Sequence, residues 1–205
     1  MSPSPLPDAV TALLLAGGQG ARMGGADKGW IALAGEPLAE RVAARLRPQA
    51  DALLISANRN RERYAALGQV VEDAAEFAGC GPLAGLEAGL AACRTRWLLS
   101  VPCDLPFLPT DLAERLLRPL RAGDAELAVA CCAGQTQPVC MALSVALLPS
   151  LRDYLRAGGR RVREWQRAVG ALQVAFDDVP DAFRNINGPE ELAAAERYAS
   201  QRAKS

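Results

Sequence analysis

The sequence of residues 13–28, LLLAGGQGARMGGADK, decides the fold class. The apolar run over residues 12–16 predicts a buried strand, and it ends directly in a series of glycines. Gly17 and Gly18 let the backbone approach a ligand closely and turn several N–H groups toward one anion. Open α/β sheets bind ligands at the carboxyl ends of their strands, so this stretch predicts a triphosphate-binding loop after a first strand.

Two positive charges follow the glycines in this loop. The guanidinium of Arg22 has the planar geometry that suits phosphate oxygens, and Lys28, expected to be exposed, adds a compact point charge. The commoner glycine-rich motifs do not fit, because a P-loop places its lysine directly after the last glycine, whereas Lys28 follows Asp27. A dinucleotide-binding fingerprint would need glycine where the chain has Met23. A plain turn with two solvated cations is the alternative, but it explains neither the density of glycines nor the two charges.

Length and composition predict a single domain. The chain has 205 residues, half of them hydrophobic, which is enough for one sizeable core. We expect residues 1–9 to be a disordered lead-in and residues 10–205 to form the domain. The formal net charge is zero, so no overall field attracts nucleic acid or an anionic membrane. No apolar run approaches the roughly 20 residues that span a bilayer.

The cysteine and histidine content limits the possible chemistry. Six cysteines are scattered without a C-x-x-C pair, and the chain has no histidine. A zinc centre would have to be assembled from scattered thiolates, and catalysis by Ser-His-Asp or Cys-His groups is excluded. The first residues lack the basic and apolar regions of a signal peptide, so the free cysteines favour a cytoplasmic location.

Apolar runs alternate with amphipathic stretches, which predicts βαβ units and a mainly parallel sheet. The expected strands cover residues 12–16, 52–57, 69–71, 97–101, 127–132, 139–143 and 172–176. The expected helices cover residues 38–47, 61–67, 82–93, 110–120, 144–156, 162–169 and 189–201. We expect Thr110 to cap the fourth helix, residues 134–138 to form a turn, and Pro82 to lie in the first turn of the third helix.

Three polar residues at the ends of these elements are candidates for a site. Asp104 closes a strongly apolar strand, so its carboxylate is expected near the glycine-rich loop, where it could hold magnesium; capping a turn is the alternative. Asp73 ends another strand at that edge and either meets a nucleoside or caps a turn. Asn187 precedes a helix, and its amide oxygen could both cap that helix and bind a metal.

Several segments resemble one family, the molybdenum cofactor guanylyltransferases of the nucleotidyltransferase superfamily. The glycine-rich loop alone would mark only the superfamily, and the later segments, in the same order, make the resemblance specific. It extends from about residue 10 to residue 200. The matching segments are residues 15–18, 22–24, 27–28, 56–59, 72–73, 81–85, 102–104, 158–162, 185–187 and 189–191.

The resemblance implies a Rossmann-like three-layer α/β sandwich with a mainly parallel sheet. It implies transfer of GMP from GTP to the phosphate of molybdopterin, with Mg²⁺ as cofactor and other proteins of molybdenum cofactor biosynthesis as partners. It implies contacts to GTP at Leu15, Ala16, Gly17, Gly18, Lys28, Ser56, Asp73 and Asp104. It implies metal ligands at Asp104 and Asn187, with Asn185 as a lesser candidate. It implies catalytic roles for Arg22, Lys28 and Asp104. The family often has asparagine where this chain has Ser56, which keeps a hydroxyl but loses the double donor of the amide.

The implied mechanism needs no protein base. The phosphate of molybdopterin is already an anion at neutral pH, and it attacks the α-phosphorus of GTP in line while pyrophosphate leaves. Magnesium, the two cationic side chains and backbone N–H groups then supply positioning and charge neutralisation. The guanine is expected over the loop of residues 81–85. The acceptor-side candidates are Gln137, Pro138, Arg160 and Arg161, with a solvated turn and helix start as the alternative.

Three other functions stay open. A cytidylyl-transferring sister enzyme would typically have alanine where this chain has Gly17. A nucleotide-binding adaptor without activity is disfavoured because both Lys28 and Asp104 are present. A sugar-1-phosphate nucleotidyltransferase usually needs a longer chain.

Overall fold

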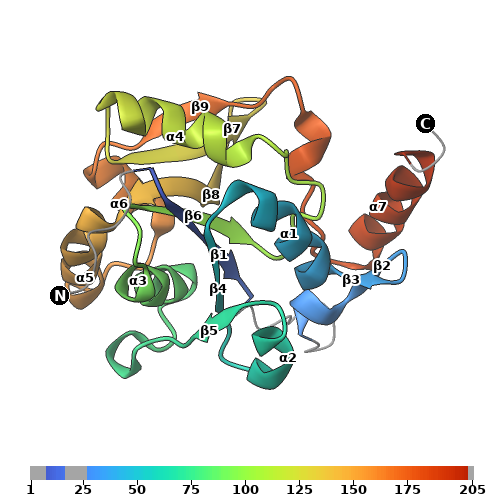
Figure 1. Ribbon diagram of the computed structural model, residues 1–205, viewed down its shortest axis with the longest axis horizontal. Coiled ribbons are helices and arrows are strands. Elements are labelled where there is room, and N and C mark those ends of the chain that lie inside the picture. Colours follow the sequence, from blue (N-terminus) through green and yellow to red (C-terminus); the bar gives the residue numbers. More distant parts are fainter. Residues whose placement is uncertain (1–7, 17–26, 203–205) are drawn as a thin grey trace.

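The computed structural model describes residues 8–16 and 27–202, which form a three-layer α/β sandwich (Figure 1). The described residues form a central seven-stranded sheet in the order β5-β4-β1-β6-β8-β7-β9. Its strands are β1 (Val10–Leu15), β4 (Ala52–Ser56), β5 (Gln69–Val71), β6 (Trp97–Pro102), β7 (Leu127–Cys132), β8 (Gln135–Ser144) and β9 (Leu172–Ala175). A small separate hairpin consists of β2 (Ala32–Leu33) and β3 (Glu36–Pro37).

Helices cover both faces of the sheet (Figure 1). The helices of the described residues are α1 (Leu38–Leu46), α2 (Arg61–Ala65), α3 (Pro82–Ala92), α4 (Leu112–Ala122), α5 (Leu148–Arg156), α6 (Val162–Ala168) and α7 (Pro189–Arg202). None of these helices, all taken from the described ranges, combines the length and hydrophobicity that crossing a bilayer requires.

All strands of the described sheet except β8 run parallel. β1 pairs in parallel with β4 and β6, β4 with β5, and β7 with β9, whereas β8 pairs antiparallel with both β6 and β7. The predicted α/β class with a mainly parallel sheet is therefore confirmed. Two predictions differ more: β8 begins four residues before its predicted start, and the helix predicted for residues 144–156 is split. The other predicted strands and helices are found with ends that differ by at most two residues.

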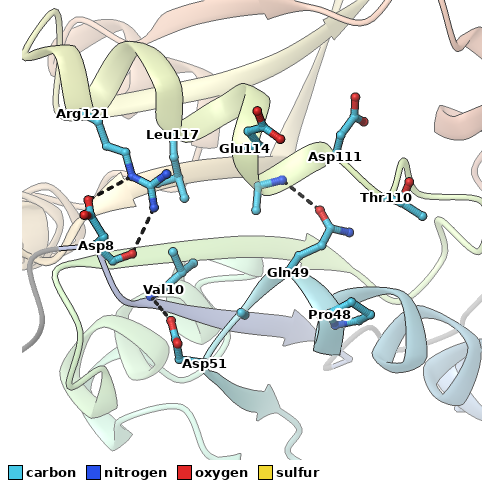
Figure 2. Close-up of a pocket in the computed structure, with 12 residues that line it drawn as sticks. Asp8, Val10, Pro48, Gln49, Asp51, Thr110, Asp111, Glu114, Leu117 and Arg121 are labelled. Atoms are coloured by element: carbon cyan, nitrogen blue, oxygen red, sulfur yellow. Dashed lines mark hydrogen bonds and ion pairs between the residues drawn. The ribbon is translucent and has the colours of Figure 1, made fainter.

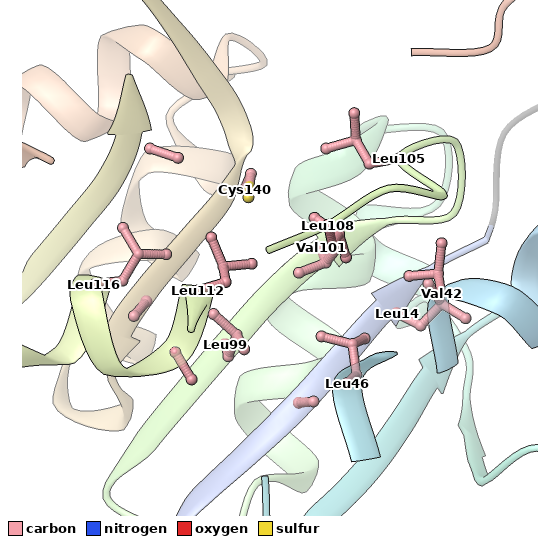
Figure 3. Packing of buried hydrophobic residues seen from close by; sticks show 14 of the residues in the cluster. Leu14, Val42, Leu46, Leu99, Val101, Leu105, Leu108, Leu112, Leu116 and Cys140 are labelled. Carbon is pink, nitrogen blue, oxygen red and sulfur yellow. The ribbon is translucent and has the colours of Figure 1, made fainter. Parts of the chain in front are cut away.

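The side chains of β1 divide between two cores. Ala12 and Leu14 face α1 and α4, and Leu13 faces α3, α5 and α6. Successive side chains of a strand point to opposite faces, so a strand covered on both sides is apolar throughout. Figure 3 shows the first core, in which Leu14 lies beside Val42 and Leu46 of α1. This burial explains why an uninterrupted apolar run leads into the glycine-rich loop.

The hairpin between β7 and β8 is tighter than predicted. We expected a turn over residues 134–138, because glycine and proline favour turns. Instead Cys132 pairs with Gln135 across a two-residue turn. Ala133 and Gly134 have φ angles of 49° and 71°, as the twist-matched hairpin turns require. Pro138 is tolerated in β8 because the β7–β8 register shifts there.

The start of α4 was also predicted wrongly. Thr110 does not cap this helix, which begins at Leu112 and has no side-chain hydrogen bond from its N-cap. Gln49 takes over that role, because its Oε1 accepts a hydrogen bond from the Ala113 N–H at 3.0 Å. Its Nε2 donates to the Pro109 carbonyl at 3.0 Å. A side chain far away in the sequence therefore satisfies the first turn of α4.

The last helix, α7, lies at the side of the sandwich next to the β2–β3 hairpin (Figure 1). A third, smaller core holds it there, composed of Leu33, Leu38, Phe107, Ile186 and Ala195. The rings of Phe107 and Tyr198 pack edge to face with centroids 4.8 Å apart. This core fixes the segment before α7 against the loop that follows β6.

Candidate active site

A pocket of about 480 Å³ opens at the carboxyl ends of β1, β4, β5 and β6. Neighbouring parallel strands end at the same edge of the sheet, which brings residues together that are far apart in the sequence. The residues that line it are Leu15, Lys28, Ser56, Asn58, Asp73, Gly79, Gly81, Pro82, Gly85, Pro102, Cys103, Asp104 and Val139. Ala16 is buried beside it, with its N–H donating to the Ser56 carbonyl at 2.9 Å. The predicted residues Gly17, Gly18 and Arg22 lie outside the described residues.

The ammonium of Lys28 joins the two predicted metal ligands. Its Nζ lies 2.5 Å from Asp104 Oδ2 and 2.7 Å from Asn187 Oδ1. The side chains of Lys28 and Asp104 are only 15% and 13% exposed, so salt and water screen this ion pair weakly. The expectation that Lys28 is an exposed loop residue was therefore wrong: its charge is held inside the site.

Asn187 reaches the site because its own segment is tied to Asp104. The Ile186 N–H donates to the Asp104 carbonyl at 3.1 Å, and the Ile186 side chain is buried in the small core under α7. The Asn187 amide oxygen is thereby directed at Lys28. Within the described residues, the Asn185 side chain makes no hydrogen bond to this cluster.

The oxygen atoms of this cluster fit a magnesium ion. Asp104 Oδ1 is buried and makes no hydrogen bond within the described part of the chain. Asp104 and Asn187 offer a carboxylate and an amide oxygen, both of which hard cations prefer. Their Oδ2 and Oδ1 atoms already lie within 2.7 Å of one positive charge. Residues 8–16 and 27–202 contain no cluster of three or more His, Cys, Asp or Glu side chains, so such a cation would also need substrate oxygens or water.

Asn58 holds Asp73 in place at the other side of the pocket. Its Nδ2 donates to Asp73 Oδ2 at 2.8 Å, and its Oδ1 accepts a hydrogen bond from the Asp73 N–H at 3.2 Å. Both side chains line the pocket. Asn58 was not among the predicted site residues, although its place just after the strand that ends at Ser56 was a signal.

Ser56 is almost fully buried, at 3% exposure, and packs against the start of α3. A Cβ at Gly85 would lie 2.3 Å from Ser56 Oγ, so only glycine allows this approach. Gly81, just before α3, has a φ of 65°, which favours glycine in the loop that borders the pocket. The small residues of this region keep the pocket open between β4 and α3.

Cys103 lines the pocket with a buried thiol. Burial, together with the neighbouring charge of Asp104, raises the pKa of its thiol to about 12. The thiolate is the reactive form of cysteine, and it is therefore scarce at neutral pH.

A second pocket, of about 550 Å³, adjoins the first and shares Pro82 and Val139 with it. Its other lining residues are Pro138, Arg161, Val162, Arg163, Glu164 and Arg167. Arg161 forms an ion pair with Glu164 at 2.8 Å. The pocket therefore combines apolar walls with a surplus of arginine.

The acceptor-side candidates are only partly found here. Pro138 and Arg161 line the second pocket, and Gln137 belongs to β8 without lining it. The Arg160 guanidinium donates to the carbonyls of Leu155 and Gly159, at 2.9 and 2.7 Å. Arg160 is therefore turned back onto its own loop.

Figure 2 shows a further pocket, of about 420 Å³, at the amino end of β1. Arg121 donates to the Asp8 carbonyl at 3.0 Å, and Asp51 Oδ2 accepts a hydrogen bond from the Val10 N–H at 2.8 Å. These polar groups satisfy one another where the chain enters β1. This pocket lies at the opposite end of β1 from Leu15.

Comparisons with known proteins identify the same family that the sequence resembles. The sequence model of the family described as "MobA-like NTP transferase domain" matches residues 12–172. The chain is 46% identical over 196 residues to a molybdenum cofactor guanylyltransferase from Cupriavidus taiwanensis, which covers 92% of this chain and 97% of that protein. It is 43% identical over 182 residues to a protein of the same name from Shewanella pealeana, covering 89% and 91% of the two chains.

Among solved structures, the fold is similar to that of molybdopterin-guanine dinucleotide biosynthesis protein A from Archaeoglobus fulgidus. The TM-score is 0.78 at 20% sequence identity, with 93% of this chain and 99% of that chain covered. At this identity the likeness supports the fold alone.

Proposed function

We propose the function of this chain from its family: the chain belongs to the MobA-like NTP transferase domains and, within them, to the molybdenum cofactor guanylyltransferases. It is a nucleotidyltransferase, and it transfers GMP from GTP to the phosphate of molybdopterin, which gives molybdopterin guanine dinucleotide and pyrophosphate. One observation carries this proposal beside the family: the predicted side chains Lys28, Asp104 and Asn187 form one hydrogen-bonded cluster, and Lys28 and Asp104 line the pocket.

The reaction is an in-line displacement at the α-phosphorus of GTP. The attacking phosphate oxygen of molybdopterin is an anion at neutral pH, so no side chain has to remove a proton from it. This agrees with a chain that contains no histidine. The protein then acts by holding the two phosphates in line and by placing positive charge where negative charge develops.

Lys28 supplies that charge. In the proposed complex its ammonium turns from Asp104 and Asn187 to the phosphates of GTP, a short movement because all three side chains lie at the same sheet edge. Arg22 and the N–H groups of Gly17 and Gly18 are proposed to bind the phosphates from the glycine-rich loop, because the Ala16 N–H already donates to the Ser56 carbonyl.

Asp104 and Asn187 are the proposed magnesium ligands. The unbonded Oδ1 of Asp104 and the amide oxygen of Asn187 support this assignment. When bound, the metal would neutralise charge on the phosphates of GTP. The backbone hydrogen bond from Ile186 to Asp104 holds the segments of Asp104 and Asn187 together. The two side chains thereby determine where the metal would lie.

Asp73 and Ser56 are the proposed contacts to the nucleoside. Asn58 occupies one carboxylate oxygen of Asp73, which leaves the other oxygen to accept hydrogen bonds. The N1–H and N2–H₂ edge of guanine offers two neighbouring donors, which a fixed carboxylate oxygen can accept.

The second pocket is the proposed site for the pterin and phosphate of the acceptor. Its apolar walls suit a flat heterocycle, and Arg163 and Arg167 suit a phosphate.

Arg167→Gln is expected to raise KM for molybdopterin about tenfold, the loss of one charge-assisted contact, and to leave the affinity for GTP unchanged. Steady-state kinetics with each substrate varied checks this. Arg118→Gln, an exposed arginine on the opposite face of the sheet, is the matched control. An unchanged KM for molybdopterin would move the acceptor elsewhere.

Nucleotide selectivity separates this function from its nearest rival. GTP at 100 times its Kd, with magnesium, is expected to stabilise the fold by about 2.7 kcal/mol, which raises Tm by roughly 5–10 °C. CTP at the same concentration should raise Tm far less. Differential scanning fluorimetry measures both shifts. Equal or better stabilisation by CTP would favour a cytidylyltransferase, and GTP binding without transfer of label from [α-³²P]GTP to molybdopterin would favour an adaptor.

A further inference from the structure

The carboxylate of Asp27, directly before Lys28, is held by three donors. Its Oδ1 accepts hydrogen bonds from Tyr64 Oη at 2.6 Å and from the Gly29 N–H at 3.2 Å. Its Oδ2 accepts one from Asn60 Nδ2 at 2.8 Å. Tyr64 lies in α2, and Asn60 directly precedes this helix. Both are far from the glycine-rich loop in the sequence.

The Tyr64 ring is itself fixed. Its side chain is fully buried in the first core, which also contains Leu14 and Val42. The Trp30 ring packs on it with centroids 4.9 Å apart, and the Arg63 guanidinium covers Trp30 at 3.9 Å. Burial and the hydrogen bond to Asp27 raise the pKa of Tyr64 well above its ordinary value. The phenol therefore stays protonated and remains a donor to Asp27.

Tyr64 also touches the residue on the other side of Lys28. A Cβ at Gly29 would lie only 2.3 Å from Tyr64 Oη, so the backbone passes directly over the hydroxyl. Lys28 thus stands between one neighbour bonded to Tyr64 and another packed on it. Its Cα has little freedom, and the length of its side chain then carries Nζ to Asp104 and Asn187.

We infer that Tyr64 and Asn60 are positioning residues for Lys28, which act through the carboxylate of Asp27. The inference rests on the proposed function for the catalytic role of Lys28. The geometry of the cluster itself does not depend on that function. Because α2 follows β4, this contact also joins Asp27 and the neighbouring Lys28 to the β4–β5 side of the sheet, where Ser56 and Asp73 lie.

The geometry can be tested without any nucleotide, because the chain has only two lysines, Lys28 and Lys204. Acetylation by an N-hydroxysuccinimide ester, followed by mass spectrometry, reports the reactivity of Lys28 with Lys204 as internal reference. Tyr64→Phe keeps the ring and removes the hydroxyl, and we expect Lys28 to become several-fold more reactive. Asn60→Ala should act in the same direction. Tyr198→Phe, which removes a phenol on α7, is the matched control. Unchanged reactivity of Lys28 in Tyr64→Phe overturns the inference.

Kinetics then distinguish positioning from a merely structural role. Tyr64→Phe is expected to lower kcat/KM for GTP about tenfold, or about 1.4 kcal/mol. In a Lys28→Met background the same change should lower the residual activity less than twofold, because there is no ammonium left to position. An equal tenfold loss in both backgrounds would show that Tyr64 acts independently of Lys28 and would overturn the inference. A wild-type chain without guanylyl transfer would overturn the proposed function, while the labelling experiment would still decide the geometry.

Discussion

Replacing Asp104 by asparagine is expected to lower guanylyl transfer by about 100-fold or more, in the range found when one preorganised electrostatic contact is removed. Asparagine keeps the size of the side chain but removes the negative charge that a hard cation requires. Excess magnesium should recover only part of the activity. The measurement is the initial rate of transfer from [α-³²P]GTP to molybdopterin over a range of magnesium concentrations.

Stability measurements provide the control for this variant. Asp104 is an ion-pair partner of Lys28 at 13% exposure, and not a cap of a turn. Its replacement should therefore cost about 1–3 kcal/mol of the free energy of unfolding, because Lys28 loses its charged acceptor. A domain stable by roughly 5–15 kcal/mol stays folded under this loss. Near-normal transfer by Asp104→Asn at ordinary magnesium concentrations would refute the metal assignment.

Lys28→Ala is expected to lower kcat/KM for GTP by about 100-fold, again the scale of one lost electrostatic contact. Lys28→Arg should restore little of it. The space between Asp104 and Asn187 holds one nitrogen within 2.7 Å of both oxygens, and a planar guanidinium is larger than an ammonium. The composition supports the need for lysine, since Lys28 is one of only two lysines among 23 Lys and Arg residues. Guanylyl transfer and GTP affinity, measured for both variants, check this.

A double variant separates charge balance from catalysis. Lys28→Met alone leaves Asp104 as a nearly buried charge without its partner, which should lower the free energy of unfolding. Lys28→Met combined with Asp104→Asn removes both charges, so stability should return toward that of the wild type while activity stays low. Urea unfolding gives the first quantity and the transfer assay the second. Recovery of activity in the double variant would mean that the pair is structural only.

The strands and most helices could be predicted because their signal is local. The apolar run that leads into the glycine-rich loop is covered by helices on both sides, and a strand buried on both faces is apolar at every position. The shared sheet edge of Asp73 and Asp104 followed from the predicted parallel strands, whose carboxyl ends lie at one edge of a sheet. The failures have two causes. Gln49, distant in the sequence, replaces Thr110 at the start of α4, and the two-residue turn holds Ala133 at a positive φ that its residue type does not signal.

The roles of the predicted site residues stay predictions, and the sequence did not reveal the hydrogen bonds that connect them. The residue types at positions 28, 104 and 187 indicated phosphate and metal chemistry, yet nothing local showed that Lys28 is paired. The contact between Asp27 and Tyr64 spans 37 residues, and the tie between Asn58 and Asp73 spans 15. Hydrogen bonds between separate loops depend on the folded arrangement, so spacing in a single sequence does not reveal them.

The position of Asn187 also sets the order in which the site is completed during synthesis. Asn187 meets a lysine that left the ribosome 159 residues earlier, an interval of roughly 8–30 s at the usual speed of translation. By then all strands of the described sheet have been synthesised, and Lys28 and Asp104 can already pair. The Asn187 amide is synthesised just before α7, and the small core that includes Phe107 and Ile186 then holds this segment against the site. A nascent chain therefore holds the strands of the sheet before it holds both proposed metal ligands, and the complete oxygen set requires synthesis through residue 187.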